Sequence, residues 1–147
     1  MNSTATASTD PQSLAEASAQ AMWARDHAAQ GLGMRIERMA PGQALMSMPV
    51  RQDMLNGHDM CHGGFMFLLA DSAFAFACNN RNQLSVALDT SINFTREVRV
   101  GDLLTATATE EHNGKSTGLY IIRIVNQEGK LVAQFKGLCY RTDKKLI

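Results

Sequence analysis

One acidic residue in this chain stands inside an otherwise apolar segment and is the first candidate for chemistry. Asp71 lies within residues 64–79, a run rich in Ala, Leu, Met and Phe that is apolar on nearly every helical face. Burying a carboxylate costs several kcal/mol unless it is protonated or paired. Asp71 therefore reaches solvent at a groove, pairs with a structural arginine, makes polar contacts at a dimer seam, or acts in catalysis.

Two glycines stand where this helix is expected to begin. His62, Gly63 and Gly64 open the run. Glycine lets backbone N–H groups approach a ligand without a Cβ in the way. The unpaired N–H groups of a first helical turn, at the positive end of the helix dipole, suit an oxygen that gains negative charge. Together with Asp71, these features predict an oxyanion hole for acyl transfer, with the Gly64 N–H as a donor.

The spacing of Gly64 and Asp71 restricts how the two groups could act together. Seven residues place them within about 20° of one helical face but about 10 Å apart along the axis. One carbonyl cannot bond to the Gly64 N–H and also be attacked from Asp71 of the same helix. We therefore expect two antiparallel helices across a two-fold axis, with Gly64 from one chain and Asp71 from the other, and two sites per homodimer.

Three polar or nucleophilic residues surround the glycines. Asn56 is suited to orienting a water molecule or a substrate carbonyl through its amide. His62 is either a general base or a cap that holds the turn, and a supporting role is favoured. Cys61 lacks the flanking pattern of a cysteine hydrolase and is interpreted as a packing residue. His58 and His62 have no third ligand nearby, so no metal site is expected.

Hydrophobic periodicity predicts an α+β fold with one buried helix and six strands. Helix-favouring residues from about 12 to 30 predict an N-terminal helix that ends at Gly31. A period of two predicts strands in the segments 34–37, 44–50, 84–94, 104–109, 120–124 and 131–135. Hairpin order gives an antiparallel sheet. A single sheet covers an all-round apolar helix only by curling around it, with a second subunit covering the remainder.

Two local details of this sheet are also predicted. Leu84 and every second residue after it, up to Phe94, should share one face of an uninterrupted strand. Asn113–Gly114 predicts a two-residue hairpin turn.

Length and composition limit the function classes. The 147 residues suit one domain, and 14 basic against 14 acidic residues give no net charge. A neutral chain argues against a nucleic-acid or anionic membrane partner. Three cysteines without a CxxC spacing favour a reducing cytoplasm. The longest apolar stretch is too short to span a bilayer.

We expect a disordered N-terminal tail over 1–13, one domain over 14–141 and a C-terminal tail over 142–147.

The residues around Asp71 resemble a known family. The resemblance is carried by LNGHDMCHGG at 55–64 and FLLADSAFA at 67–75, and it continues through GDLLTATA at 101–108, GKST at 114–117 and VNQEGK at 125–130. These segments are similar to hotdog-fold acyl-CoA thioesterases, most of all the phenylacetic acid degradation type, over roughly residues 20–141.

The resemblance implies a fold, an assembly and a reaction. The fold would be a hotdog, with a six-stranded antiparallel sheet around a long central helix. The assembly would be a homodimer, usually paired into a homotetramer. The reaction would be hydrolysis of an acyl-CoA thioester, of the phenylacetyl or ring-hydroxylated phenylacetyl kind. Neither a metal nor a cofactor is implied, because coenzyme A is part of the substrate.

The resemblance also implies roles for individual residues. Asp71 matches the catalytic carboxylate, Gly64 matches the glycine that polarises the thioester carbonyl, and Asn56 and His62 match residues that line the reaction centre. Asp71 would attack directly, forming an anhydride, or activate water. Related human enzymes carry an assisting serine on the strand after the helix. The matching position here is Ala87, with Ser85 and Ser91 two and four positions away.

Binding the coenzyme A phosphates requires cations. The candidates are Arg96, Arg99, Lys115 and Lys130, of which Arg96 and Lys115 are favoured because they flank strand ends beside the expected cleft. Ser116 and Thr117 would add hydrogen bonds to the pantetheine or phosphates. Gly63 is expected to contact the substrate through its backbone.

Two other functions fit the same resemblance. One is a non-catalytic acyl-CoA-binding hotdog protein, which Asp71 disfavours. The other is a hotdog hydratase or dehydratase. That chemistry uses a positioned Asp–His or His–Glu pair, and His62 is the only candidate histidine for it.

Overall fold

The computed structural model describes residues 10–147. The expected disorder of residues 1–9 lies outside the described residues. The secondary structure comprises α1 Pro11–Trp23, α2 His27–Gly31, β1 Arg35–Ala40, β2 Gln43–Pro49, a short 3-10 helix Gln52–Met54, α3 Gly63–Asn79, β3 Ser85–Phe94, β4 Leu103–Asn113, β5 Thr117–Val125 and β6 Leu131–Arg141. No helix within residues 10–147 is long and apolar enough to cross a membrane.

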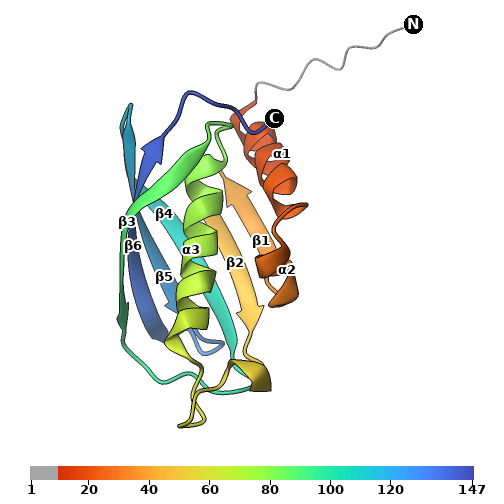
Figure 1. The fold of residues 1–147 in the computed structure, drawn as a ribbon, viewed down its shortest axis with the longest axis vertical. Helices are drawn as coiled ribbons and strands as arrows, with labels where there is room; N and C mark the ends of the chain where they lie inside the picture. Colours follow the sequence, from red (N-terminus) through yellow and green to blue (C-terminus); the bar gives the residue numbers. More distant parts are fainter. Residues whose placement is uncertain (1–9) are drawn as a thin grey trace, which may run out of the picture.

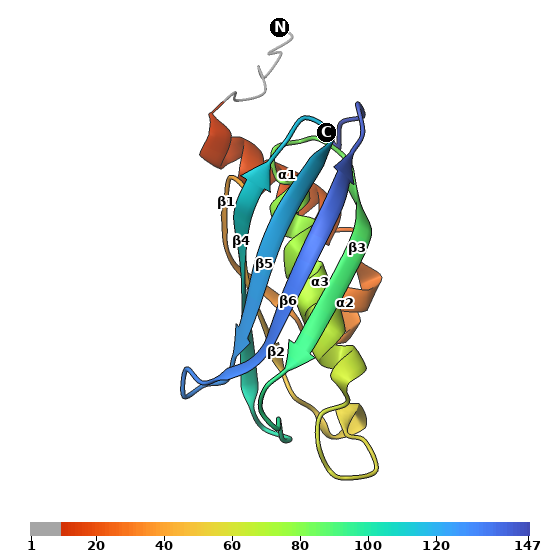
Figure 2. The same ribbon diagram turned by 90° about the vertical axis from the view of Figure 1, so that its left-hand side faces the viewer.

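The six strands form one antiparallel sheet in the order β1-β2-β4-β5-β6-β3. The sheet curves around α3, which runs along its concave face (Figure 1). Figure 2 shows the outer face of the sheet, with β3 at one edge. The predicted α+β fold, a six-stranded antiparallel sheet around a central helix with an N-terminal helix, is confirmed.

The central helix is buried on most of its surface, as its composition predicts. Its largest buried side chains, Leu69, Phe74 and Phe76, are at most 1 % exposed. A stripe along one side remains partly or fully exposed. This stripe consists of Gly64, Leu68, Asp71 and Ala75, which are spaced by three or four residues. The sheet of one chain therefore leaves uncovered the side of α3 that carries Asp71.

The N-terminal helical region differs in two ways from its prediction. Asp10 accepts a hydrogen bond from the Ser13 N–H and caps α1, with Pro11 in the first turn. Residues 11–13 therefore belong to the helix rather than to a tail. The single helix predicted over 12–30 is also broken, because Asp26 accepts from the Ala29 N–H and starts α2 as a separate helix. α1 packs against β1 and α3.

The uninterrupted alternation predicted for β3 is wrong. A β-bulge interrupts the pairing with β6 between Ala87 and Asp89. Before the bulge, Ala87 lies opposite the buried Cys139, whereas after it Ile92 lies opposite the buried Phe135. One inserted residue, Leu88, thus exchanges the two faces of the strand.

The hairpin between β4 and β5 also differs from its prediction. Asn113 pairs with Gly118, and residues 114–116 form the loop between the strands. Neither Asn113 nor Gly114 has the positive φ that a type I′ turn needs at both central residues. The two-residue turn predicted from Asn113–Gly114 is therefore wrong.

Candidate active site

His62 caps the N-terminus of α3. Its backbone is extended, and its side-chain Nδ1 accepts a hydrogen bond from the Gly64 N–H at 3.1 Å. Two roles were considered for His62, a general base and a cap, and the structure shows the cap. The N–H for which the sequence predicts an oxyanion hole is the one that His62 Nδ1 binds.

The two glycines of this turn have different surroundings. A Cβ on Gly63 would lie 2.9 Å from Cζ of Phe94, because that ring packs on the glycine backbone. A Cβ on Gly64 would meet only the His62 ring, at 3.4 Å. A side chain at 63 would therefore displace the Phe94 ring, whereas at 64 the backbone faces open space beyond the histidine.

Asn56 is held by the loop that precedes the helix. Its Oδ1 accepts hydrogen bonds from the backbone N–H groups of His58 at 2.8 Å and Met60 at 3.2 Å. The Asn56 N–H donates to the Met60 carbonyl at 2.7 Å. Because two donors fix the oxygen, the orientation of the amide is determined. Its Nδ2 has no acceptor within the described part of the chain, and it is the group left to donate to a ligand.

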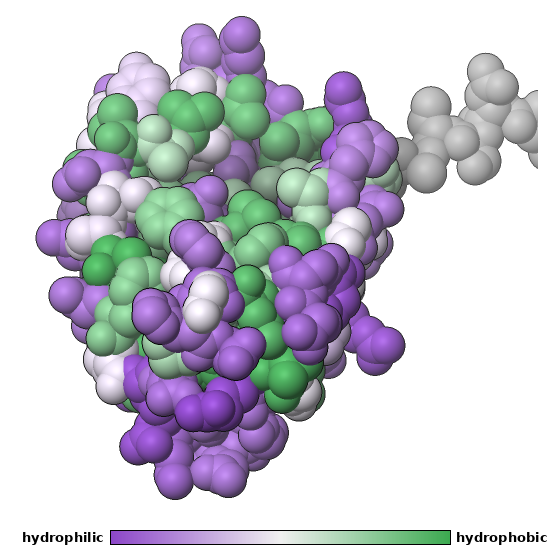
Figure 3. Space-filling view, turned by 60° about the horizontal axis from the view of Figure 1, so that its bottom comes forward, coloured by the Kyte–Doolittle hydropathy of each residue, from purple (hydrophilic) through white to green (hydrophobic). Residues whose placement is uncertain are grey.

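A cleft of about 490 Å³ opens beside Gly63, between the start of α3 and the segment after β3. Its apolar lining comprises Met60, Cys61, Met66, Phe94 and Val98. Figure 3 faces this end of the molecule and shows apolar surface exposed between polar side chains. We refer to this cleft of about 490 Å³ as the Gly63 cleft.

Arg96 contributes a cation to the rim of the Gly63 cleft. The neighbouring Glu97 is paired with Arg99. Arg96 itself has no ion-pair or hydrogen-bond partner among residues 10–147, so its guanidinium is available to a ligand. Burial raises the pKa of the Cys61 thiol to about 11, which keeps it protonated and agrees with a packing role.

Asp71 lies two turns further along α3, on the exposed stripe. Burial raises the pKa of its carboxyl above the ordinary value. No hydrogen bond or ion pair satisfies its side chain within residues 10–147. Pairing with a structural arginine, one of the alternatives for this residue, is thus not seen in this chain. A half-buried carboxylate without a partner is a candidate for proton transfer or nucleophilic attack.

The other predicted substrate-binding residues lie at the opposite end of the molecule. The Ser116 carbonyl accepts from the Arg141 N–H at 2.8 Å, and the Arg141 Nη1 donates to the Cys78 carbonyl at 3.0 Å. Lys115, Ser116 and Thr117 are therefore beside the C-terminal end of α3, about 20 Å from Gly63 by helix rise. The expectation that Lys115 flanks the same cleft as Arg96 is wrong within one chain.

The three positions considered for an assisting serine do not share one face of β3. Ala87 and Ser85 face α3, whereas Ser91 lies opposite the exposed Lys136 on the outer face. The Ser85 hydroxyl donates to the Gln83 carbonyl at 3.1 Å and accepts from Arg141 at 3.2 Å. No serine hydroxyl on β3 is therefore left to assist Asp71.

Sequence reasoning did not single out the apolar lining of the Gly63 cleft. Phe94 is predicted only as a strand residue, and the sequence assigns no role to Met60 or Met66. The only sequence feature that could have indicated this lining is Gly63, because a glycine allows a bulky side chain to pack directly on the backbone.

Comparison with known proteins decides the family. The family described as the thioesterase superfamily matches residues 58–133. The chain belongs to the thioesterase superfamily. The matched segment contains His62, Gly64 and Asp71. The predicted enzyme class, a thioester hydrolase, and the hotdog fold are thereby confirmed.

Individual relatives of this thioesterase agree. Acyl-coenzyme A thioesterase PaaI of Escherichia coli is 50% identical over 123 residues, which cover 84% of this chain and 88% of that protein. The solved structure of the E. coli PaaI protein from the phenylacetic acid degradation operon has a TM-score of 0.90 and 46% identity, covering 92% of this chain and 98% of that one. The predicted resemblance to the phenylacetic acid degradation type is confirmed.

A more distant thioesterase structure contains a ligand. It is a hypothetical thioesterase protein from Streptococcus pneumoniae with coenzyme A. Its TM-score is 0.74 and its identity 28%, covering 76% of this chain and 88% of that one.

Proposed function

We propose that this thioesterase hydrolyses an arylacetyl-CoA, either phenylacetyl-CoA or a ring-hydroxylated form, to the free acid and coenzyme A. The observation that carries this proposal is Asp71, a half-buried carboxylate with a raised pKa and no partner in the described chain. The relationship to E. coli PaaI supports the acyl-CoA class and the arylacetyl group.

The Gly64 N–H and the Asn56 amide are the donors for the developing oxyanion. The thioester oxygen takes the place of His62 Nδ1 at the Gly64 N–H. Asn56 Nδ2 donates from the loop, since its Oδ1 is fixed by two backbone N–H groups. The Asn56 donor is oriented before the substrate arrives, whereas the Gly64 N–H becomes available when the His62 imidazole moves away.

Asp71 supplies the base or the nucleophile. As a base, it takes a proton from a water molecule that attacks the thioester carbonyl; as a nucleophile, it forms an anhydride that water then cleaves. In both routes the C–S bond breaks, and the coenzyme A thiolate leaves with the electron pair and is then protonated. Water supplies the remaining oxygen of the acid product.

The active enzyme in this proposal is a homodimer in which each site uses both chains. β3 is an edge strand, and its Val86, Leu88 and Phe94 are 49%, 57% and 52% exposed. Pairing two β3 edges in antiparallel fashion would place a partner strand beside these side chains and would cover the exposed stripe of α3. Gly64 of one chain would then lie near Asp71 of the partner subunit. A homotetramer would be a pair of such dimers.

Steady-state hydrolysis of an acyl-CoA panel, followed by the release of free thiol, tests the proposal. We expect phenylacetyl-CoA or a hydroxylated form to have the highest kcat/KM. Asp71→Asn should lower kcat about 100-fold or more, because it removes a group that acts in the transition state. Binding of acyl-CoA without hydrolysis, or equal turnover in the variant, would contradict the proposal.

A further inference from the structure

One wall of the Gly63 cleft is a segment without regular secondary structure. Residues 95–102 connect β3 to β4, and four of them line the cleft, namely Thr95, Arg96, Glu97 and Val98. Neither a helix nor a sheet fixes the backbone here, so individual hydrogen bonds have to do so. The shape of this wall therefore depends on a few contacts that the segment makes with its neighbours.

Two of these contacts join the segment to β6 and to the loop before α3. Thr95 donates to the Val132 carbonyl at 2.9 Å through its N–H and to the Leu131 carbonyl at 2.8 Å through its hydroxyl. The carbonyl of Val98, a buried residue, accepts from the Cys61 N–H at 2.7 Å. A movement of the wall would therefore also pull on the loop that leads into the central helix.

The third contact joins the end of the segment to the turn between β5 and β6. Asp102 Oδ2 accepts from the Arg99 N–H at 2.9 Å, and Asp102 Oδ1 accepts from Gln127 Nε2 at 2.9 Å. Gln127 Oε1 in turn accepts from the Leu103 N–H at 3.1 Å. One amide thus holds both the carboxylate that binds Arg99 and the first residue of β4. We refer to the side chains of Asp102 and Gln127 as the Gln127 clasp.

The turn that carries Gln127 is itself fixed. Asn126 Oδ1 accepts from the N–H groups of Glu128 at 3.0 Å and Lys130 at 3.1 Å, and the Gly129 N–H donates to the Asn126 carbonyl at 2.9 Å. Figure 2 shows this turn at the same end of the sheet as the connection between β3 and β4. The Gln127 side chain is exposed, so its position is set by polar contacts and not by burial in the core.

We propose that Gln127 is a positioning residue for acyl-CoA binding, because through Asp102 it holds the 95–102 segment as the wall of the Gly63 cleft. This inference rests on the proposed function. The catalytic carboxylate and the oxyanion donors of that function do not belong to the clasp. Loosening the clasp should therefore weaken substrate binding more than the chemical step, which raises KM with little change in kcat.

Exchanging the two side chains of the clasp tests this role at constant net charge. In Gln127→Glu alone, two carboxylates face each other without a donor between them. In the double variant Asp102→Asn with Gln127→Glu, the amide at 102 donates to the carboxylate at 127, and the Arg99 and Leu103 N–H groups keep their acceptors. We expect Gln127→Glu to raise KM for phenylacetyl-CoA about fivefold, with kcat changed less than about twofold. The double variant should return KM to near the wild-type value.

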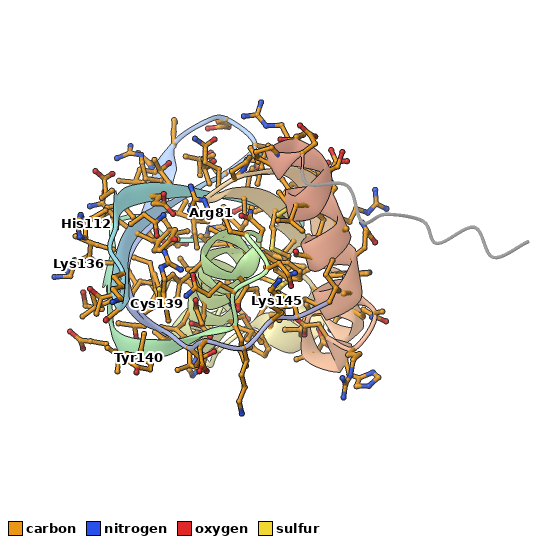
Figure 4. All side chains as sticks on the ribbon, turned by 90° about the horizontal axis from the view of Figure 1, so that it is seen from above. Arg81, His112, Lys136, Cys139, Tyr140 and Lys145 are labelled. Carbon is orange, nitrogen blue, oxygen red and sulfur yellow. The ribbon has the colours of Figure 1, made fainter. Side chains whose placement is uncertain are left out.

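Gln134→Glu is the matched control, because an added negative charge alone repels the coenzyme A phosphates. Gln134 is exposed on the outer face of β6, two residues before Lys136, whose side chain projects away from α3 (Figure 4). Its KM should equal that of the wild type. A clasp that only stabilised the fold would change the free energy of unfolding of Gln127→Glu and leave KM unchanged. That result, an equal rise of KM in Gln134→Glu, or no recovery in the double variant would overturn the inference.

Amide hydrogen exchange separates this inference from the proposed function. The Cys61 N–H should exchange faster in Gln127→Glu than in the wild type, because its acceptor, the Val98 carbonyl, lies on the segment that the clasp holds. In the double variant it should slow again. If the wild type hydrolysed no acyl-CoA, the proposed function would fail, while this exchange would still decide whether the clasp holds the wall. Unchanged exchange at Cys61 in Gln127→Glu would overturn the inference.

Discussion

The Gly64 N–H and Nδ1 of His62 form a hydrogen bond of 3.1 Å at the start of the central helix. The Gly64 N–H therefore has two successive functions. Without substrate it donates to the capping His62 side chain, and with substrate it is the proposed donor to the thioester oxygen. The imidazole therefore has to yield this N–H at each turnover, while the helix keeps its other first-turn N–H groups.

The capping function predicts a difference between two His62 variants. His62→Ala should lower the free energy of unfolding by about 1 kcal/mol, because the Gly64 N–H loses its acceptor. His62→Asn should retain most of that stability, since asparagine is a favoured N-cap. Urea unfolding at constant protein concentration measures both. Equal destabilisation by alanine and asparagine would show that the imidazole stabilises the protein by something other than the cap.

The raised pKa of Asp71 predicts a pH-dependent stability difference. The folded protein holds the proton of this carboxyl more tightly than the unfolded chain, whose pKa is near 3.8. Stability contributed by the protonated form is thus lost as the pH rises from that value through the folded-state pKa. Asp71→Asn should therefore be more stable than the wild type at pH 7, and the difference should shrink as the pH falls toward 3.8. Urea unfolding across this pH range measures it. A difference that did not change with pH would not come from titration of Asp71.

The contact between Gly63 and Phe94 predicts a coupled pair of substitutions. Gly63→Ala should raise KM for the acyl-CoA, because its Cβ would lie 2.9 Å from Cζ of Phe94 and displace that ring in the cleft. In Phe94→Ala the ring is absent, so adding Gly63→Ala should cost much less. A double-mutant cycle on KM measures this coupling. Additive effects of the two substitutions would mean that the ring does not transmit the change.

Much of the fold follows directly from the sequence, and the exceptions have local causes. The buried helix was predictable because it is apolar on nearly every side, so Asp71 stood out against it. The exchange of faces in β3 could not be predicted, because the alternation of apolar residues continues through the one-residue bulge at Leu88. Lys115 and Arg96 were grouped because both are cations that flank strand ends. Strand direction separates them, since β3 ends near Gly63 and β4 ends near the C-terminus of α3 (Figure 2).

The shared site predicts that two inactive variants restore each other. Asp71→Ala removes the carboxylate, and Gly64→Pro removes the N–H in the first helical turn, where proline is tolerated. If each site takes Gly64 from one chain and Asp71 from the partner subunit, a mixed dimer has one intact site and one doubly defective site. Random mixing of equal amounts should then recover roughly a quarter of the wild-type activity, because half of the dimers are mixed and each has one of two sites.

The measurement is thiol release after the variants are unfolded together and refolded. Each variant refolded alone is the control for residual activity, and wild type treated in the same way gives the reference rate. If the two groups served one site within a single chain, every chain in the mixture would lack one of them and no activity would return. Recovery therefore distinguishes a shared site from an intrachain site without requiring the structure of the dimer.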